Sequence, residues 1–282
     1  MEQIQRIERS IIKKFRKPIW NRFVGGVKDY RLIEAGDRIA VCISGGKDSM
    51  LLAKCMQQLQ KYSEVPFELV FLSMDPGYPA ADAQRVADNA RLLEIPLTAF
   101  STRIFEIVSQ QGKSPCYLCA RMRRGCLYRR AQELGCNKIA LGHHFDDVIE
   151  TILMGMLYSG KVETMMPKLY SQHFEGMELI RPLYLVREAD ISAWARYNEL
   201  EFIRCACGVS SQDDCGGEGS KRQTVKKLIA QLRLENSNVD SNIFHSAQNV
   251  CLDAVLGWRG RGGAHGFLDD YDGMRSWARR CV

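Results

Sequence analysis

The chain contains no apolar stretch that approaches the length of a membrane span, and it contains no internal repeats. Its first residues carry no secretory hydrophobic segment, so we expect a cytoplasmic protein without a membrane partner. A strong charge of one sign is also missing, because the net charge is only +6. Contents of 46% hydrophobic and 26% charged residues are those of an ordinary globular protein. In a cytoplasmic chain, eleven cysteines do not predict a disulfide framework.

Strands alternate with helices over the central part of the sequence. The hydrophobic pattern predicts strands at 38–43, 67–74, 96–101, 137–142 and 179–183. Helices are predicted at 49–62, 80–94, 102–111, 120–135 and 146–158. This alternation predicts βαβ units in an α/β fold, with a Rossmann-like parallel sheet and helices on both faces. Ligands of such sheets bind outside the carboxyl ends of the strands.

We expect four segments along the chain. An N-terminal helical segment covers 1–36, with an amphipathic helix at 1–24, and the α/β domain covers 37–185. A helical C-terminal part covers 186–256, with predicted helices at 187–198, 221–235 and 240–256. The tail at 257–282 begins rich in glycine and arginine. Its composition favours a flexible, disordered end over a nucleic-acid contact.

The most informative motif lies between the first predicted strand and the helix after it, and it reads Ser44-Gly45-Gly46-Lys47-Asp48-Ser49. Glycines allow a tight turn that presents backbone N–H groups to an anion, and the helix N-terminus adds partial positive charge. Lys47 can neutralise a phosphate oxygen, and Ser44 and Ser49 can donate hydrogen bonds. Gly-Gly-Lys-Asp is also a good turn sequence, but the flanking strand and helix favour a phosphate site. The spacing is not that of the Walker loop.

A second polar motif, Gly142-His143-His144-Phe145-Asp146-Asp147, follows the apolar run at 139–141. Its carboxylates begin the next helix, where they could simply favour the helix dipole. A carboxylate that faces ATP phosphates would instead hold Mg²⁺, which takes only one or two protein oxygens. Asp75 follows another predicted strand, so it should lie at the same edge of the sheet as Gly142.

Two cysteine pairs, Cys116 with Cys119 and Cys205 with Cys207, need a chemical account. Cysteines that fall singly in apolar or helical contexts are most simply small core residues, namely Cys42, Cys55, Cys126, Cys136 and Cys251. The spacing of the first pair can direct both sulfurs to one metal. The residues leave open a zinc site, a redox pair or an iron–sulfur cluster, although Cys-x-Cys is a less usual zinc spacing.

The order of these motifs resembles the tRNA 2-thiocytidine synthetase family, iron–sulfur tRNA thiolases of the PP-loop ATP pyrophosphatase superfamily. The loop at 44–49 is similar to the PP-loop itself. The match runs over roughly 20–255 and includes Cys116-Tyr117-Leu118-Cys119, Arg121-Met122-Arg123-Arg124-Gly125, Leu141–Asp147, Met166-Pro167-Lys168-Leu169, Ile180-Arg181-Pro182-Leu183 and Cys207-Gly208. One motif departs from the family's Pro-Cys-x-x-Cys-Gly, since Arg204-Cys205-Ala206-Cys207-Gly208 is one residue shorter and lacks the proline.

The resemblance implies a PP-loop ATPase fold and an ATP-dependent tRNA sulfurtransferase that forms AMP and pyrophosphate. Such an enzyme adenylates the C2 carbonyl of an anticodon-loop cytidine and replaces its oxygen with sulfur, giving 2-thiocytidine. Implied catalytic residues are Asp48, Arg123 and Asp146, with Mg²⁺ at Asp146. Implied ATP-binding residues are Ser44, Gly45, Gly46, Lys47, Asp48, Ser49, Asp75, Gly142 and His143.

The resemblance also implies a [4Fe–4S] cluster held by three cysteines, with one iron left open to bind the incoming sulfur. Its ligands would be Cys116, Cys119 and Cys207, with Cys205 as the alternative for the third. The implied partners are tRNA and a sulfur donor such as a cysteine desulfurase or free sulfide. Basic clusters on the helices at 1–24 and 120–135 would hold the tRNA backbone.

Several alternatives stay open at this point. The sequence does not decide whether the chain forms a homodimer. A rival enzyme is a PP-loop sulfurtransferase that acts on another nucleotide or on a small molecule. A rival from another class is a nucleotide-binding iron–sulfur sensor that performs no chemistry, but the carboxylates near the phosphate loop argue against it.

Overall fold

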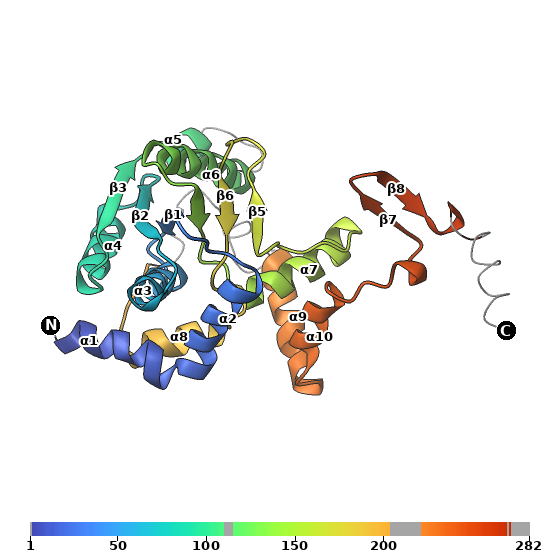
Figure 1. Ribbon diagram of the computed structural model, residues 1–282, viewed down its shortest axis with the longest axis horizontal. Helices are drawn as coiled ribbons and strands as arrows, with labels where there is room; N and C mark the ends of the chain where they lie inside the picture. Colours follow the sequence, from blue (N-terminus) through green and yellow to red (C-terminus); the bar gives the residue numbers. More distant parts are fainter. Residues whose placement is uncertain (1, 110–114, 204–220, 270, 272–282) are drawn as a thin grey trace.

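The computed structural model describes residues 2–109, 115–203, 221–269 and 271, and its centre is a six-stranded sheet of order β3-β2-β1-β4-β6-β5 (Figure 1). The strands are β1 (Arg38–Ile43), β2 (Glu68–Asp75), β3 (Leu97–Ser101), β4 (Lys138–Ala140), β5 (Lys168–Tyr170) and β6 (Glu178–Ile180). Neighbouring strands pair in parallel, except that β5 pairs with β6 antiparallel. The predicted α/β fold with helices on both faces of a mostly parallel sheet is confirmed.

The side chains of β1 alternate between two cores. Ile39 and Val41 face one core, and Ala40 and Cys42 face the other, because successive side chains of a strand point to opposite faces. The first core lies under the helices of the N-terminal segment and also under α3 (Lys47–Tyr62), α4 (Ala80–Leu92) and α8 (Glu188–Tyr197). The second lies under α6 (Pro115–Glu133), which also packs against α5 (Ile104–Ser109).

A third core joins three helices beside the sheet: α7 (Phe145–Ser159), α9 (Lys221–Glu235) and α10 (Val239–Ser246). Its buried residues include Val148 of α7 and Val225 of α9. The rings of Phe145 and Phe244 lie 4.9 Å apart and connect α7 to α10. This packing holds α9 next to α7, whose N-terminus carries the second polar motif.

The N-terminal segment is amphipathic, but it is not the single regular helix that the sequence predicts. It consists of α1 (Glu2–Arg9), π-helical turns at Ser10–Lys14 and Arg16–Trp20, and α2 (Asn21–Asp29). Pro18 lies in the second π-helical turn and donates no backbone hydrogen bond, which favours an irregular turn there. Most of the apolar stripe is buried nonetheless, and Ile7 and Ile11 have no exposed surface.

Other boundaries also differ from the prediction. Helix α6 begins at Pro115 rather than near 120, because proline suits the first helical turn. The helix predicted at 240–256 ends with α10 at Ser246. The predicted disordered tail begins instead with an antiparallel hairpin of β7 (Gly257–Gly260) and β8 (Gly263–Gly266), and its residues 270 and 272–282 lie outside the described residues. In the described part of the chain, no helix is long and apolar enough to cross a membrane. The four-segment division stays a prediction.

Candidate functional site

The loop between β1 and α3 has the geometry of a phosphate cradle. Gly45 has a φ of +85°, and a Cβ atom there would lie 2.4 Å from Val86 and 2.8 Å from Ile203, so only glycine fits. The buried Ser49 hydroxyl braces the turn, since it donates to Gly46 O at 3.0 Å and accepts from Ser44 N at 3.2 Å. No side chain of the described residues caps α3 at Gly46, which leaves its first N–H groups for an anion.

The loop opens into a cavity of about 700 Å³ at the carboxyl ends of β1 and β4. This volume is ordinary for a small-molecule site. Elements from across the chain supply its polar lining, which includes Ser44, Asp48, Ser49, Arg123, Arg124, Gly142, His143, His144, Asp147, Glu150, Glu188, Arg222 and Lys226. The structure therefore brings the phosphate loop and the second polar motif together, as the sequence predicts.

Gly142 allows this convergence. A Cβ atom at this position would lie 3.1 Å from Ser49 N and 3.2 Å from the carbonyl carbon of Asp48. The backbone after β4 therefore touches the first turn of α3 directly. A side chain would have to push rigid backbone apart at this point.

His143 presents a neutral ring to the cavity. Arg181 Nε donates to His143 Nδ1 at 3.2 Å. Burial and the Arg181 charge lower the pKa of His143 to about 4, so the ring is uncharged at neutral pH. Because a guanidinium can only donate, the proton of the neutral ring lies on Nε2. His143 can therefore donate one hydrogen bond to a ligand.

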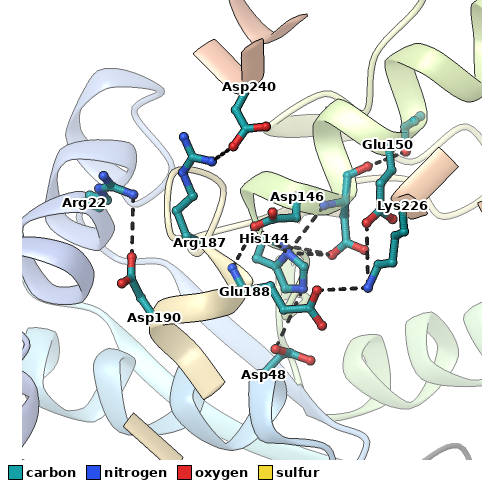
Figure 2. Close-up of polar contacts among 12 residues, drawn as sticks. Arg22, Asp48, His144, Asp146, Glu150, Arg187, Glu188, Asp190, Lys226 and Asp240 are labelled. Carbon is teal, nitrogen blue, oxygen red and sulfur yellow. Dashed lines mark hydrogen bonds and ion pairs between the residues drawn. The ribbon is translucent and has the colours of Figure 1, made fainter. Parts of the chain in front are cut away.

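His144 caps α7 in a reciprocal arrangement with Asp147. Its backbone N–H donates to Asp147 Oδ2 at 3.0 Å, and its Nδ1 accepts from Asp147 N at 3.4 Å. The remaining ring nitrogen, Nε2, lies 3.9 Å from Asp48 Oδ1 (Figure 2). The helix cap thus orients His144 toward the phosphate loop.

Asp48 Oδ1 is buried and receives no hydrogen bond within the described part of the chain. Lys47 Nζ is nearby, at 3.2 Å. A buried carboxylate oxygen without a hydrogen bond is unfavourable. A cation that accompanies the nucleotide would satisfy this atom, so Asp48 suits Mg²⁺.

Glu188, at the start of α8, bridges two lysines. Its carboxylate lies 3.2 Å from Lys47 Nζ and 2.9 Å from Lys226 Nζ. Burial alone would raise the pKa of Glu188, but Lys226 and Lys47 outweigh it and lower the pKa to about 2. Burial likewise opposes the charge of Lys47, yet Asp48 and Glu188 raise the pKa of its ammonium. Both groups are charged at neutral pH.

Glu150 is the most buried carboxylate of the cavity lining, with 2% of its side chain exposed. Arg222 Nη1 contacts it at 3.1 Å and also donates to Asp147 at 2.8 Å, while Lys226 Nζ lies 3.7 Å away. Burial raises the pKa of Glu150 to about 7, although the two cations lower it. These contacts attach α9 to the N-terminal half of α7.

Asp146 and Asp75 hold structure beside the cavity rather than lining it. Asp146 accepts from Glu188 N at 2.7 Å and from Arg233 Nη2 at 2.8 Å. Both of its oxygens are therefore engaged, and Asp147, not Asp146, lines the cavity. The Mg²⁺ role of Asp146 stays a prediction. Asp75 Oδ1 accepts from Gly77 N and Tyr78 N in the turn after β2.

Tyr78 links that turn to the site. Its hydroxyl donates to Ser44 O at 3.4 Å and accepts from Arg123 Nη2 at 3.4 Å. Arg123 and Arg124 line the cavity from α6. The predicted catalytic position of Arg123 is therefore close to the phosphate loop.

Comparisons with known proteins show the family of this chain. A family model described as the PP-loop domain matches residues 10–209. A tRNA-cytidine(32) 2-sulfurtransferase from Anaeromyxobacter sp. (strain K) is 36% identical over 260 residues, which cover 91% of this chain and 84% of that protein. Another from Geobacter sulfurreducens is 38% identical over 237 residues, covering 83% and 90%. The chain belongs to the tRNA-cytidine(32) 2-sulfurtransferase family. The predicted family is confirmed, and as a PP-loop protein the chain binds ATP.

A solved structure supports the fold of this family member. This protein is similar to the U34-tRNA thiolase NcsA from Methanococcus maripaludis, whose structure was solved with its [4Fe–4S] cluster. The TM-score is 0.64 at 21% identity, and the similarity covers 81% of this chain and 76% of that chain. The likeness shows a shared PP-loop fold.

The predicted cluster ligands are only partly described. Cys116 and Cys119 both lie in α6, and Cys119 is buried beside Met74 and Phe105. Cys205 and Cys207 lie outside the described residues. No group of three or more potential metal ligands occurs among the residues that the structure describes.

The remaining cysteines fit their predicted role in most cases. Cys42, Cys55 and Cys136 are buried core residues, and burial raises the pKa of Cys42 to about 12. Cys126 is half-buried. Cys251 is exposed, so its prediction as a core residue is wrong.

Among the polar residues of the cavity lining, those without a predicted site role are Arg124, His144, Asp147, Glu150, Glu188, Arg222 and Lys226. The last two come from α9, whose position beside α7 depends on packing rather than on a local motif. The spacing of Arg222 and Lys226 places both on one face of the predicted helix, so the sequence could have indicated a basic face there.

Proposed function

We propose that this protein replaces the C2 oxygen of a cytidine in the tRNA anticodon loop with sulfur, in an ATP-dependent reaction that yields 2-thiocytidine. Its relatives are named for cytidine 32 of tRNA. One structural observation supports the proposal beyond family membership. Ala120 and Arg123, which follow Cys119 in α6, line the same cavity as Ser44 and Asp48. Activation of the base and delivery of sulfur would therefore share one site.

In the first step, ATP would bind with its phosphates at the N-terminus of α3. The C2 carbonyl oxygen of cytosine attacks the α-phosphorus, a new P–O bond forms, and the bond to pyrophosphate breaks. Lys47 and Arg123 would stabilise the negative charge on the phosphates, since preorganised cations favour such a transition state. Asp48 would hold Mg²⁺, which neutralises phosphate charge when bound. His143 Nε2 can donate to the nucleotide or the base.

In the second step, sulfur replaces the activated oxygen and AMP leaves. Positions 116 and 119 are one helical turn apart, so they lie on the same side of α6 and suit two ligands of one [4Fe–4S] cluster. We propose Cys207 as the third ligand, with Cys205 as the alternative. Such a cluster would supply the sulfur nucleophile. A cysteine desulfurase or free sulfide would be the sulfur source.

The decisive experiment is mass spectrometry of nucleosides from the tRNA of cells that lack this gene. We expect 2-thiocytidine to disappear and to return with the wild-type gene but not with Cys119→Ser. Unchanged 2-thiocytidine would contradict the substrate. Loss of a different thionucleoside would identify the rival PP-loop sulfurtransferase, and purified protein that never exchanges pyrophosphate into ATP in the presence of tRNA would favour the sensor.

A further inference from the structure

The C-terminal hairpin β7–β8 takes no part in the proposed chemistry. It forms a two-stranded sheet of its own, and Figure 1 shows it beyond α9 and α10, away from the six-stranded sheet. The strand residues are exposed, apart from the half-buried His265. A two-stranded hairpin without a core is only marginally stable in water. The exposed side chains of the hairpin therefore do not form a core, and another role has to explain them.

The strand register brings two aromatic rings together on one face of the hairpin. Trp258 and His265 are cross-strand partners, and their rings stack with centroids 4.0 Å apart and planes at 12°. Gly260 on the same face leaves room for the indole, because a Cβ atom there would lie 2.7 Å from Trp258 Cζ3. Trp258 nevertheless stays 39% exposed. The pair forms a flat aromatic surface that is accessible to solvent.

The charge of the hairpin is positive. Arg259 lies on the opposite face from Trp258, and Arg261 lies in the turn, while residues 257–266 contain no Asp or Glu. These ten residues contain no aliphatic side chain larger than alanine, but Leu256 and Phe267, which flank them, are exposed, so the test below also includes a contact between protein copies as an outcome. Aromatic rings interleaved with arginines match an RNA strand, whose bases stack and whose phosphates are anionic.

We infer that the β7–β8 hairpin is an RNA-binding element that contacts the tRNA substrate outside the cavity. Trp258 and His265 stack on an unpaired base, and Arg259 and Arg261 contact phosphates. The inference rests on the proposed function, because it takes tRNA as the substrate. It also gives a role to the Gly/Arg-rich sequence, which composition alone assigns to disorder.

The test is a titration of fluorescently labelled tRNA transcript with the full-length protein at several salt concentrations. R259A/R261A is expected to weaken binding about fivefold to tenfold, and to lower the slope of log K against log salt by about one to two. R259K/R261K should retain most of the binding. W258A should weaken binding about tenfold, and W258F less, because stacking needs a ring. The matched control, R85A/R91A, removes two exposed arginines from α4 and should bind as the wild type does.

Each outcome separates the inference from the function on which it rests. If the wild type binds and thiolates tRNA and R259A/R261A binds equally well, the inference is wrong and the proposed function stands. If the wild type binds ATP but binds no tRNA, both are wrong. If R259A/R261A binds tRNA normally but sediments as a smaller species, the hairpin is a contact between protein copies. The double variant keeps the Trp258–His265 pair, so circular dichroism should report an unchanged fold.

Discussion

His144 Nε2 lies 3.9 Å from Asp48 Oδ1, at the point where the second polar motif meets the phosphate loop. The other ring nitrogen of His144 accepts from Asp147 N, so the first turn of α7 fixes the ring. Asp48 is consequently flanked by Lys47 and by an oriented imidazole, while its side chain lines the cavity. Among the predicted catalytic residues, Asp48 has the environment that best suits a role in ATP activation.

Asp48→Asn preserves the size of the side chain but removes its charge. We expect pyrophosphate exchange into ATP to fall about a hundredfold, the usual loss when one preorganised electrostatic contact is removed. The unfolding midpoint in urea should change little. Asp88→Asn, on the exposed surface of α4, is the matched control and should exchange normally. Wild-type exchange in Asp48→Asn would contradict the assignment.

Gly45→Ala and Gly36→Ala separate backbone strain from lost space. Both glycines have similar φ angles, +85° and +84°, so each alanine costs about 1 kcal/mol in that conformation. Gly36 has open space around it, whereas a Cβ at Gly45 would overlap Val86 and Ile203 and add about 1–3 kcal/mol. Urea unfolding should therefore find Gly45→Ala clearly less stable than Gly36→Ala. Equal losses would mean that the loop relaxes around the methyl group.

Glu150 makes stability depend on pH in a defined direction. Its pKa in the folded protein is about 7, above the ordinary value of 4.5, so the folded state binds the extra proton between these values. Its contribution to stability is then fully present below about pH 4.5 and is lost as the pH rises through 7. Glu150→Gln mimics the protonated form. Its free energy of unfolding should therefore fall less than that of the wild type between pH 5 and 8, as measured by urea titration. Parallel profiles for both proteins would contradict the raised pKa.

Cys119→Ser tests the cluster with a control from the same helix. We expect anaerobically purified Cys119→Ser to lose the brown colour and most of the bound iron. Cys126→Ser, also in α6 and half-buried, should keep both. Absorbance near 400 nm and iron analysis would be the readouts, because thiolates are the ligands of such clusters. A colourless wild-type protein with stoichiometric zinc would rule out the iron–sulfur assignment.

The centre of the sheet could be predicted because β1 and the second half of β2 are buried on both faces and read as continuous apolar runs. The predicted bounds of β1, β2 and β3 lie within one residue of the observed ones. The short edge strand β5 was missed, since Lys168–Tyr170 has no such run and pairs in the opposite direction. Helix α9 was predicted at its observed bounds.

The contacts of α9 with α7 could not be predicted from local sequence patterns. Arg222 pairs with Asp147 and Glu150, which precede it by more than seventy positions in the sequence. Helical periodicity predicts which residues share a face, but it does not predict which helix that face meets. The conformation of the phosphate loop, by contrast, depends on residues that are neighbours in the sequence. Its glycines and serines favour that conformation locally, so it could be predicted.

The close approach at Gly142 has a consequence for motion in the site. The backbone after β4 touches the backbone of Asp48 and Ser49 without an intervening side chain. Close-packed groups transmit displacement instead of absorbing it. The phosphate loop and the N-terminus of α7 should therefore move as one rigid unit, so that any shift caused by nucleotide at the loop reaches His143 and His144 undiminished.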